Sequence, residues 1–477
     1  MRKDIVNSIL LSVLFSFFVE GAFSQTVRSS YFLEGMPGRH KLNPAFSGSY
    51  NYIGFPGLSG IVVGGNGNVG VSNFLFPGEG GQLMNFLDPS VNATQFLDNI
   101  KSTNKVTADI NVTLLSAGFY AFNGYNTIDV SIRANSDIRA PKEIFEFLKV
   151  GRLGTGTTTM YDMSDIKVNA SSYVDIAFGH SRRINDKWEV GGKIKALLGL
   201  GRVNMDIDRI NLTMTQTNWI IESHGTANVA FPGAEFHKTS AVDVRGYDRE
   251  VIDGFDVNKY NFKIVGGGIG FDVGAVFRPI KNLSVSAALT DVGFICWTGN
   301  KAAQTINDRF IYNGYDDEEG GTLITDGDIS KDLSALLQFE EVNKYRTTTA
   351  LQASLNLGVE YSFLQNMISL GALSHTRFGP LVYTEGMLVA NIRAPKIFMM
   401  SVNGTISNLG GSFGALINIC PKGFNFFVGI DCFPGLRFTP KYYIPTSKFN
   451  VNYSMGINIT FGEKNPRKES TAKYADI

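Results

Sequence analysis

Hydrophobic and polar residues alternate with a period of two in several long segments of the chain. In the clearest segment, residues 449–461, every odd position is apolar and every even position is Asn, Ser, Gly or Thr. The pattern recurs over residues 351–363 and in shorter form over 188–196, 269–277 and 424–432. This is the period of a β-strand with two different faces. The longest segments exceed the roughly 5–6 residues of a typical globular strand and reach the roughly 9–11 that cross a bilayer.

Short turn sequences separate neighbouring alternating segments, and they contain residues that accept tight-turn dihedrals. These turns are Arg183–Lys187, Pro279–Asn282, Leu364–Asn366 and Pro421–Gly423. They predict the same antiparallel hairpin three times, over residues 175–195, 270–290 and 355–374. Long loops are expected at the other end of the strands, over residues 77–105, 136–169, 231–263 and 296–345. Outer-membrane barrels have this asymmetry, with short turns on the periplasmic side.

Together these patterns predict an all-β protein, a transmembrane antiparallel up-and-down β-barrel. The alternating segments between Gly60 and Phe461 correspond to about 14 strands, within a range of about 14–16. We expect the barrel over residues 60–462 and a C-terminal tail over residues 463–477. Alternation also fits an exported soluble β-sandwich, which stays open as an alternative.

Residues 1–24 have the three-part pattern of a secretory signal peptide. Two basic residues follow Met1, residues 5–19 are mostly apolar, and a small-x-small sequence ending at Ser24 predicts cleavage before Gln25. Beyond this segment no run of about 18 apolar residues predicts a transmembrane helix. An exported membrane barrel is expected in the cell outer membrane.

Composition and charge exclude one class of partner. The 477 residues include 43 Lys and Arg and 43 Asp and Glu, so the formal net charge is zero. A nucleic-acid-binding protein would show a basic excess or stripe, so no nucleic-acid partner is expected. The 52 glycines and 12% aromatic residues agree with many strands and turns.

The last alternating segment resembles a known recognition signal. Ser454-x-Gly456-x-x-Ile459-x-Phe461 is similar to the C-terminal motif by which the barrel-assembly machinery recognises outer-membrane clients. The resemblance implies that this machinery and outer-membrane lipid are partners of the chain. The sequence departs from the usual pattern because residues 462–477 follow the motif.

Asn43-Pro44-Ala45 resembles the Asn-Pro-Ala segment near the start of fatty-acid-transporter-like (FadL-like) barrels, a superfamily that includes the PorV-type barrels of the type IX secretion system. Residues 289–297 and 456–462 are similar to an uncharacterised branch of that superfamily. In the family, the segment before the first strand folds into the barrel as a hatch. The resemblance therefore implies that residues 25–59 plug the lumen, with Asn43, Pro44 and Ala45 as hatch candidates. A plain turn at Asn-Pro is the alternative.

If the apolar residues of each strand face lipid, their neighbours face the lumen. The lumen-facing candidates are Asp129, Arg133, Glu189, Lys193, Lys195, Asp272, Arg278, Glu360 and Asp431. Their mixed signs favour ion pairs that brace the wall or the hatch over an ion selector of one sign. Contact with a ligand is the alternative.

No enzyme is expected. Residues 410–414 match the G-x-S-x-G pattern of hydrolases, but that motif needs a helix after the Ser and a His further along the chain. Here residues 415–419 continue as a strand, and the last histidine is His375. The five histidines show no metal-ligand spacing with Cys or acidic residues. We therefore expect no catalytic, cofactor-binding or metal site.

The resemblance implies passive transport of hydrophobic small molecules across the outer membrane. The alternative is a non-transporting barrel that docks protein partners in secretion or surface assembly, as PorV-type members do. A lumen continuous with an apolar pocket would favour transport. A filled lumen with apolar loop tips would favour docking.

Overall fold

The computed structural model describes residues 28–78, 83–151, 157–215, 218–242, 248–257, 263–306, 309–312, 337, 339–343, 346–394, 397–433 and 450–463. The predicted signal peptide and the tail after Glu463 lie outside these ranges. Most of the described backbone is β-strand. Within the same ranges, no helix has the length and apolar character needed to span a membrane.

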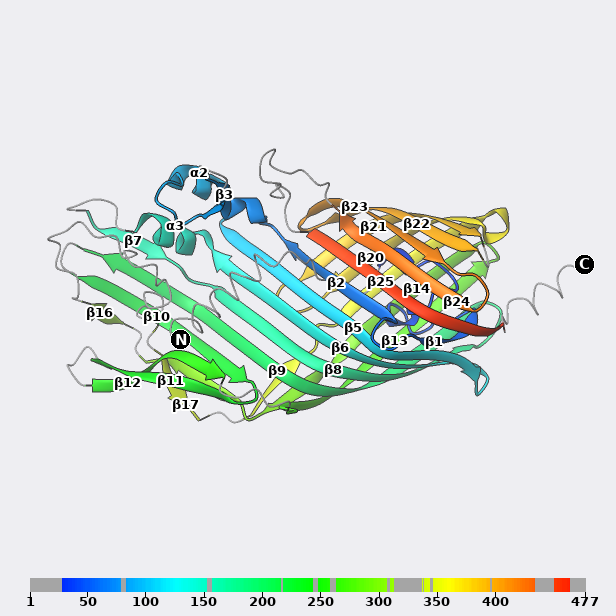
Figure 1. Ribbon diagram of the computed structural model, residues 1–477, viewed down its shortest axis with the longest axis horizontal. Helices are drawn as coiled ribbons and strands as arrows, with labels where there is room; N and C mark the ends of the chain where they lie inside the picture. Colours follow the sequence, from blue (N-terminus) through cyan, green and yellow to red (C-terminus); the bar gives the residue numbers. More distant parts are fainter. Residues whose placement is uncertain are drawn as a thin grey trace, which may run out of the picture.

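Fourteen antiparallel strands close into a barrel (Figure 1). The first wall strand is interrupted and consists of β1 (Tyr50–Gly54) and β2 (Gly60–Gly67). The next wall strands are β5 (Thr103–Ala121), β6 (Gly124–Pro141), β8 (Ile166–Arg183), β9 (Trp188–Met214), β13 (Gly266–Ile280) and β14 (Leu283–Thr298). The remainder are β18 (Arg346–Ala350) with β19 (Ser354–Phe363), β20 (Ile368–Arg377), β21 (Tyr383–Ala394), β22 (Phe398–Ser407), β23 (Gly410–Ile419), β24 (Phe424–Phe433) and β25 (Asn450–Glu463). β25 pairs with β24 on one side and with β1 and β2 on the other, which closes the ring. The predicted all-β, antiparallel up-and-down barrel of about 14 strands is confirmed.

The three predicted hairpins are present as the pairs β8–β9, β13–β14 and β19–β20. Their turns lie at one end of the barrel, which we call the short-turn end. In the β19–β20 turn, Leu364, Gln365 and Asn366 all have positive φ, between 44° and 72°. This left-handed backbone makes the tight reversal that the local sequence predicts.

The wall begins earlier than the alternation indicates. The pattern starts at Gly60, but β1 already pairs with β25 and β5 from Tyr50 onward. The sequence signal is hidden because residues 55–59 interrupt the ladder between β1 and β2. Pro56 lies in this interruption, and proline has no amide hydrogen for a ladder bond.

The prediction of long loops at the other end is wrong in part, because several of these connections contain strands. Further strands are β3 (Leu75–Pro77), β4 (Leu83–Asn85), β7 (Thr159–Asp162), β10 (Trp219–Ala230), β11 (Ala234–Val242), β12 (Asp248–Val257), β15 (Lys301–Thr305), β16 (Phe310–Tyr312) and β17 (Phe339–Val342). The helices there are α2 (Ala93–Asp98), α3 (Lys142–Val150) and the 3-10 helix η3 (Val71–Asn73). We call these elements, with residues 201–214 of β9, the outer extension, which lies on the left of Figure 1.

The outer extension is a sheet that continues from the barrel wall. β10 pairs with the far half of β9, and the order then runs β10, β15, β17, β12, β11. Most side chains of β11 are exposed, including four consecutive residues from His237 to Ser240. A strand that meets water on both faces needs no apolar alternation, so the period-two signal is absent there.

The barrel wall is apolar on the outside and polar on the inside. Outward-facing Ile194, Leu388 and Phe413 are 65%, 71% and 72% exposed. Many of their inward neighbours are polar, as Lys193 and Lys195 on either side of Ile194 show, whereas Met387 and Val389 beside Leu388 are apolar and buried. An apolar outer band around a polar interior is the arrangement of a membrane barrel.

Candidate functional site

Residues 28–49 lie inside the barrel, and we call them the luminal segment. They contain the 3-10 helices η1 (Arg28–Ser30) and η2 (Arg39–Lys41) and no strand. Their apolar side chains form two clusters with inward-facing wall residues. One cluster contains Tyr31, Phe32, Leu42, Ala45, Phe46, Val276, Leu373, Met387 and Val389, and the other contains Leu33, Met36, Val62, Met399, Leu416, Cys420 and Phe427. The lumen is therefore packed with side chains at this level.

The hatch candidates Asn43, Pro44 and Ala45 form a turn against the inner wall. The Asn43 side-chain oxygen accepts a hydrogen bond from the Ala45 amide at 2.9 Å. A Cβ added to Gly191 would lie 2.1 Å from the Pro44 carbonyl oxygen, and one added to Gly274 would lie 2.1 Å from Asn43 Oδ1. Only glycine fits at these wall positions, because the turn approaches the wall backbone so closely.

A first polar cluster joins the luminal segment to β5, β6 and β9. Its centre is Asp129, which lies 2.8 Å from His40 Nε2 and accepts a hydrogen bond from Ser116 at 2.7 Å. Lys193 Nζ is 3.4 Å and Lys41 Nζ 3.8 Å from the same carboxylate. Because Asp129 and Lys193 come from the wall and His40 and Lys41 from the segment, this cluster fixes the segment in place.

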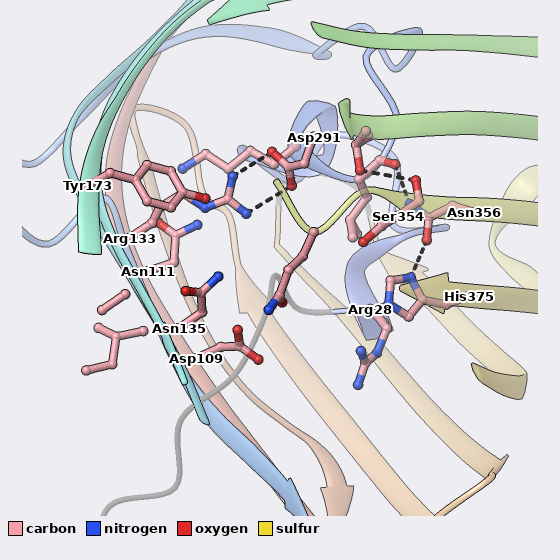
Figure 2. Close-up of a pocket in the computed structure, with 16 residues that line it drawn as sticks. Arg28, Asp109, Asn111, Arg133, Asn135, Tyr173, Asp291, Ser354, Asn356 and His375 are labelled. Atoms are coloured by element: carbon pink, nitrogen blue, oxygen red, sulfur yellow. Dashed lines mark hydrogen bonds and ion pairs between the residues drawn. The ribbon is translucent and has the colours of Figure 1, made fainter. Parts of the chain in front are cut away.

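A second cluster braces the wall itself (Figure 2). Arg133 donates two hydrogen bonds to Asp291, at 2.6 and 2.9 Å. Lys195 lies 2.6 Å from Asp291 and 2.8 Å from Asp272. Asp291 has a φ of 58° and sits where the β13–β14 register shifts, and its amide donates to Asp272. This irregular backbone brings a carboxylate into the lumen that regular alternation would not place there.

The remaining candidates near the short-turn end are also paired. Glu189 accepts hydrogen bonds from Arg278 at 3.0 Å and from Ser47 of the luminal segment. Glu360 forms an ion pair with Arg393. These contacts are the bracing interactions that mixed charges favour.

Asp431 holds the start of the luminal segment. Its carboxylate accepts hydrogen bonds from the backbone amide of Arg28, at 2.7 Å, and from Ser29. The Arg28 side chain turns to β21, where its Nε lies 2.5 Å from Glu385. The nine predicted lumen-facing residues thus lie buried or half-buried inside the barrel, each beside an oppositely charged or hydrogen-bonding group.

Several luminal residues were missed by the sequence reasoning. Arg377 lies 2.6 Å from Asp109 and 3.6 Å from Asp137, and Glu385 contacts Arg28. Arg377 and Glu385 could have been found by extending the alternation through β20 and β21, whose outward residues are apolar. The resemblance implies a luminal position for Arg28, which lies within residues 25–59, but nothing in the sequence indicates its partners Asp431 and Glu385.

The polar cavity between the luminal segment and the wall is small (Figure 2). Its volume is about 50 Å³, and its lining includes Asp109, Arg133, Tyr173, Asp291 and His375. That space holds about one to three water molecules. Within the described ranges, no group of three or more His, Cys, Asp or Glu side chains is placed to hold a metal ion.

The assembly-signal candidates lie on β25, which closes the barrel. Ser454 is buried and donates to the Gly429 carbonyl at 3.2 Å, whereas Ile459 and Phe461 are exposed on the outer face. A Cβ on Gly456 would lie 2.4 Å from the Phe427 ring. Gly456 therefore lets a luminal aromatic side chain pack against the closing strand.

The chain has low similarity to several solved membrane proteins. The toluene transporter TbuX of Ralstonia pickettii shares 10% identity at a TM-score of 0.40, with 90% of this chain and 95% of that chain covered. The toluene transporter TodX of Pseudomonas putida shares 8% identity at a TM-score of 0.38, with 92% of this chain and 94% of that chain covered. A FadL homologue of Pseudomonas aeruginosa shares 9% identity at a TM-score of 0.36, with 92% of this chain and 98% of that chain covered.

Likenesses at this level carry no argument about function, although they agree in kind with the predicted resemblance to FadL-like barrels. No curated protein matches the chain. The family model described as "Family of unknown function (DUF5723)" matches residues 44–431, which is most of the chain. This protein therefore belongs to the DUF5723 family.

Proposed function

We propose that this protein is an outer-membrane β-barrel with a closed lumen, which docks a partner protein at the cell surface through its outer extension. The observation that carries the proposal is the filled lumen. Two apolar clusters and several ion pairs occupy it. One cavity between segment and wall measures about 50 Å³, and another of about 550 Å³ lies at the short-turn end. A cavity that binds benzene measures about 150 Å³, so the smaller of these two cavities admits no apolar ligand of that size.

The outer extension has the properties of a docking platform. Short turns are periplasmic in outer-membrane barrels, which places the extension outside the cell. It has its own apolar core, in which Phe96 is stacked on Phe86 at 4.6 Å between ring centres and contacts Phe74 and Phe145 edge-on. Such a core keeps the extension folded in water, so that its exposed strands present a fixed surface.

Site-specific photo-cross-linking in cells tests this proposal. A photoreactive amino acid at Thr239, exposed on β11, should give one discrete adduct with a surface protein. The matched control is Ile194, which is also exposed but lies on the outer face of the barrel wall, where we expect lipid. Absence of an adduct at Thr239, or the same adduct at both positions, would contradict docking through the extension.

Transport of a hydrophobic small molecule is the second candidate, and one observation favours it. The backbone–backbone hydrogen bonds of the luminal segment join residues 28–46 to one another, and the described residues show none that reaches the wall. The segment can therefore move as a hatch without breaking the barrel sheet.

A disulfide that fixes the luminal segment to the wall distinguishes the transport function from the docking function. Ser47 Oγ on the segment and Ser181 Oγ on the wall are 3.2 Å apart, so cysteines at both positions are placed to cross-link. If the protein transports toluene or oleate into proteoliposomes, the oxidised Ser47→Cys/Ser181→Cys variant should lose that activity and regain it on reduction. If it is a docking barrel, neither state should transport.

We also propose that β25 carries the assembly signal. Replacing Met455–Asn458 by Ser-Gly-Ser-Gly keeps Gly456 but removes the apolar side chains of Met455 and Ile457, and with them the apolar alternation of the closing strand. Assembled barrel should then disappear from the membrane, as measured by the different migration of unheated and boiled samples. Normal surface levels of the altered protein would argue against this role.

A further inference from the structure

A cavity of about 550 Å³ lies at the short-turn end of the barrel. Phe46 and residues 47–49 of the luminal segment line one side, and residues 120–125 of the β5–β6 hairpin and Arg278 line others. Its volume falls within the roughly 300–1,000 Å³ of typical binding sites. In the proposed orientation it faces the periplasm, and neither candidate function uses it.

Arg39 is a buried cation on this cavity, and Glu34 and Glu360 are the acidic residues that act on its charge, neither in a direct ion pair with it. It is 7% exposed, and its Nε and Nη2 both donate to the Tyr31 carbonyl, at 3.1 and 2.7 Å. Its guanidinium lies 4.2 Å from the centre of the Phe46 ring. Within the described ranges, no carboxylate lies within 4.0 Å of it. A buried charge is costly unless paired, so the cavity is suited to an anionic group.

Two of the acidic residues that line the cavity are already engaged by arginines. Glu189 pairs with Arg278 at 3.0 Å, and Glu360 pairs with Arg393. Glu34 also lines the cavity and accepts a hydrogen bond from Asn366 at 3.1 Å. The negative charge of Glu34 repels an anionic ligand. Removing this charge should therefore strengthen binding, the opposite of the effect expected for removing the charge of Arg39.

Phe122 borders the same cavity and has an unfavourable backbone conformation that no contact within the described part of the chain compensates. It has a φ of 54° and, with Asn123 at 57°, forms a tight turn with both central residues left-handed. Bulky residues rarely adopt this conformation, whereas Asn and Gly accept it readily. The ring is 83% exposed, so it gains no burial within the chain. A bound partner would give this ring a contact that the isolated protein lacks.

The luminal segment also presents free backbone donors to the cavity. Among the described residues, none accepts a hydrogen bond from the amides of Ser47, Gly48 or Ser49. A Cβ on Gly48 would lie 2.3 Å from Tyr125 Oη, so the backbone here runs directly against the hairpin. Unpaired donors on three consecutive residues favour pairing with the backbone of another chain.

We propose that this short-turn cavity binds an acidic, extended peptide segment of a periplasmic protein. A carboxylate of the peptide would pair with Arg39, its backbone would pair with residues 47–49, and an apolar neighbour would pack on Phe122. The free amides and the exposed rim favour a peptide over an enclosed small molecule. This site is independent of docking at the outer extension and depends only on the proposed orientation.

Peptide selection on the intact barrel tests the proposal. A phage-displayed library of random 12-residue peptides is selected on the full-length protein in nanodiscs. Asp and Glu should be enriched at least five-fold over the starting library, next to aromatic or aliphatic residues. For the best peptide, Arg39→Gln should weaken binding at least ten-fold, and Glu34→Gln should strengthen it two- to three-fold.

Phe122→Asn separates binding from folding. Arg39 also holds the Tyr31 carbonyl, so its replacement perturbs the luminal segment as well. Asn at position 122 suits the turn, and this variant should assemble normally while binding the peptide three- to five-fold more weakly. The matched control is Leu364→Asn, because Leu364 is 68% exposed with a φ of 44° in another short turn and does not line the cavity.

Three results would overturn the proposal. The first is a selection that enriches no peptide, or enriches peptides without acidic residues. The second is an equal loss of affinity for Phe122→Asn and Leu364→Asn. The third is a small organic acid found bound at one copy per barrel by native mass spectrometry, with no peptide able to displace it.

Discussion

The barrel wall and the outer extension distribute their side chains in opposite ways. In the wall, apolar residues cover the outside and most charged residues lie inside, beside two apolar clusters, whereas the extension buries an apolar core and exposes many polar residues. A single strand, β9, belongs to both regions. Near its start Ile194 is exposed and Lys195 is buried, and near its end Ile210 and Leu212 are both 1% exposed.

The difference follows from the solvent that each region meets. Apolar side chains are about as stable in contact with lipid as in a protein interior. The wall can therefore carry them on its outer face, while its polar side chains form hydrogen bonds and ion pairs within the lumen. Water penalises exposed apolar surface, so the extension needs a conventional core. One chain therefore contains two regions in which apolar residues lie on opposite sides, outward in the wall and inward in the extension.

The largest expected effect is on the core of the extension. Phe96→Ala removes a fully buried ring from the aromatic cluster and should destabilise the extension by about 4 kcal/mol. Limited proteolysis should cut the outer strands, while the heat-dependent gel shift of the barrel persists. Loss of the gel shift would show that the two regions fold as one unit.

The next largest effect is expected in the lumen. Lys195→Met leaves the carboxylates of Asp272 and Asp291 without one of their cations and should cost about 3 kcal/mol in unfolding free energy. Urea titration in vesicles measures this change. The double variant Lys195→Met/Asp272→Asn should recover part of the loss, and no recovery would mean that the pair does not act through charge.

A charge on the lipid face should have a smaller effect. Ile194→Arg places a cation in the outer band and should cost about 2 kcal/mol. Lys193→Arg, one residue away on the luminal side, keeps the charge beside Asp129 and should be close to neutral in the same urea titration. Equal costs at both positions would contradict the assignment of inner and outer faces.

The smallest effect is expected in the short turns. Asp186→Asn removes an exposed ion pair with Arg183 and should change the unfolding free energy by less than about 1 kcal/mol. The gel shift and the urea midpoint should both stay close to those of the unaltered protein. A large loss would show that this turn contributes to assembly beyond its ion pair.

Much of the wall could be predicted from sequence, because lipid imposes a strict alternation on every membrane strand. Residues 449–461 predict β25 closely, and the hairpin turn at Leu364–Asn366 lies where its residues indicate. β1 was missed because Pro56 and its neighbours interrupt the pattern. Strand β11 of the extension was missed because side chains exposed on both faces need no alternation.

The luminal site was predicted less completely. Alternation identified Lys193 and Lys195, which lie inside the barrel. It could not identify Asp291, whose left-handed backbone breaks the alternation, or Arg28, which lies outside any wall strand. The alternation also does not indicate which luminal residues pair with one another, because residues as distant in sequence as Arg28 and Asp431 meet only when the barrel closes.

The sequence by itself determined the architecture of this protein, a membrane barrel of about 14 strands with short turns at one end. Period-two patterning is local, and the solvent outside the wall enforces it at each strand separately. Only the tertiary structure decided how the luminal segment packs against the wall, which charges pair across the lumen, and that a cavity with a buried Arg39 lies at the short-turn end. Those features depend on contacts between residues far apart in the chain, which exist only after the barrel has closed around the luminal segment.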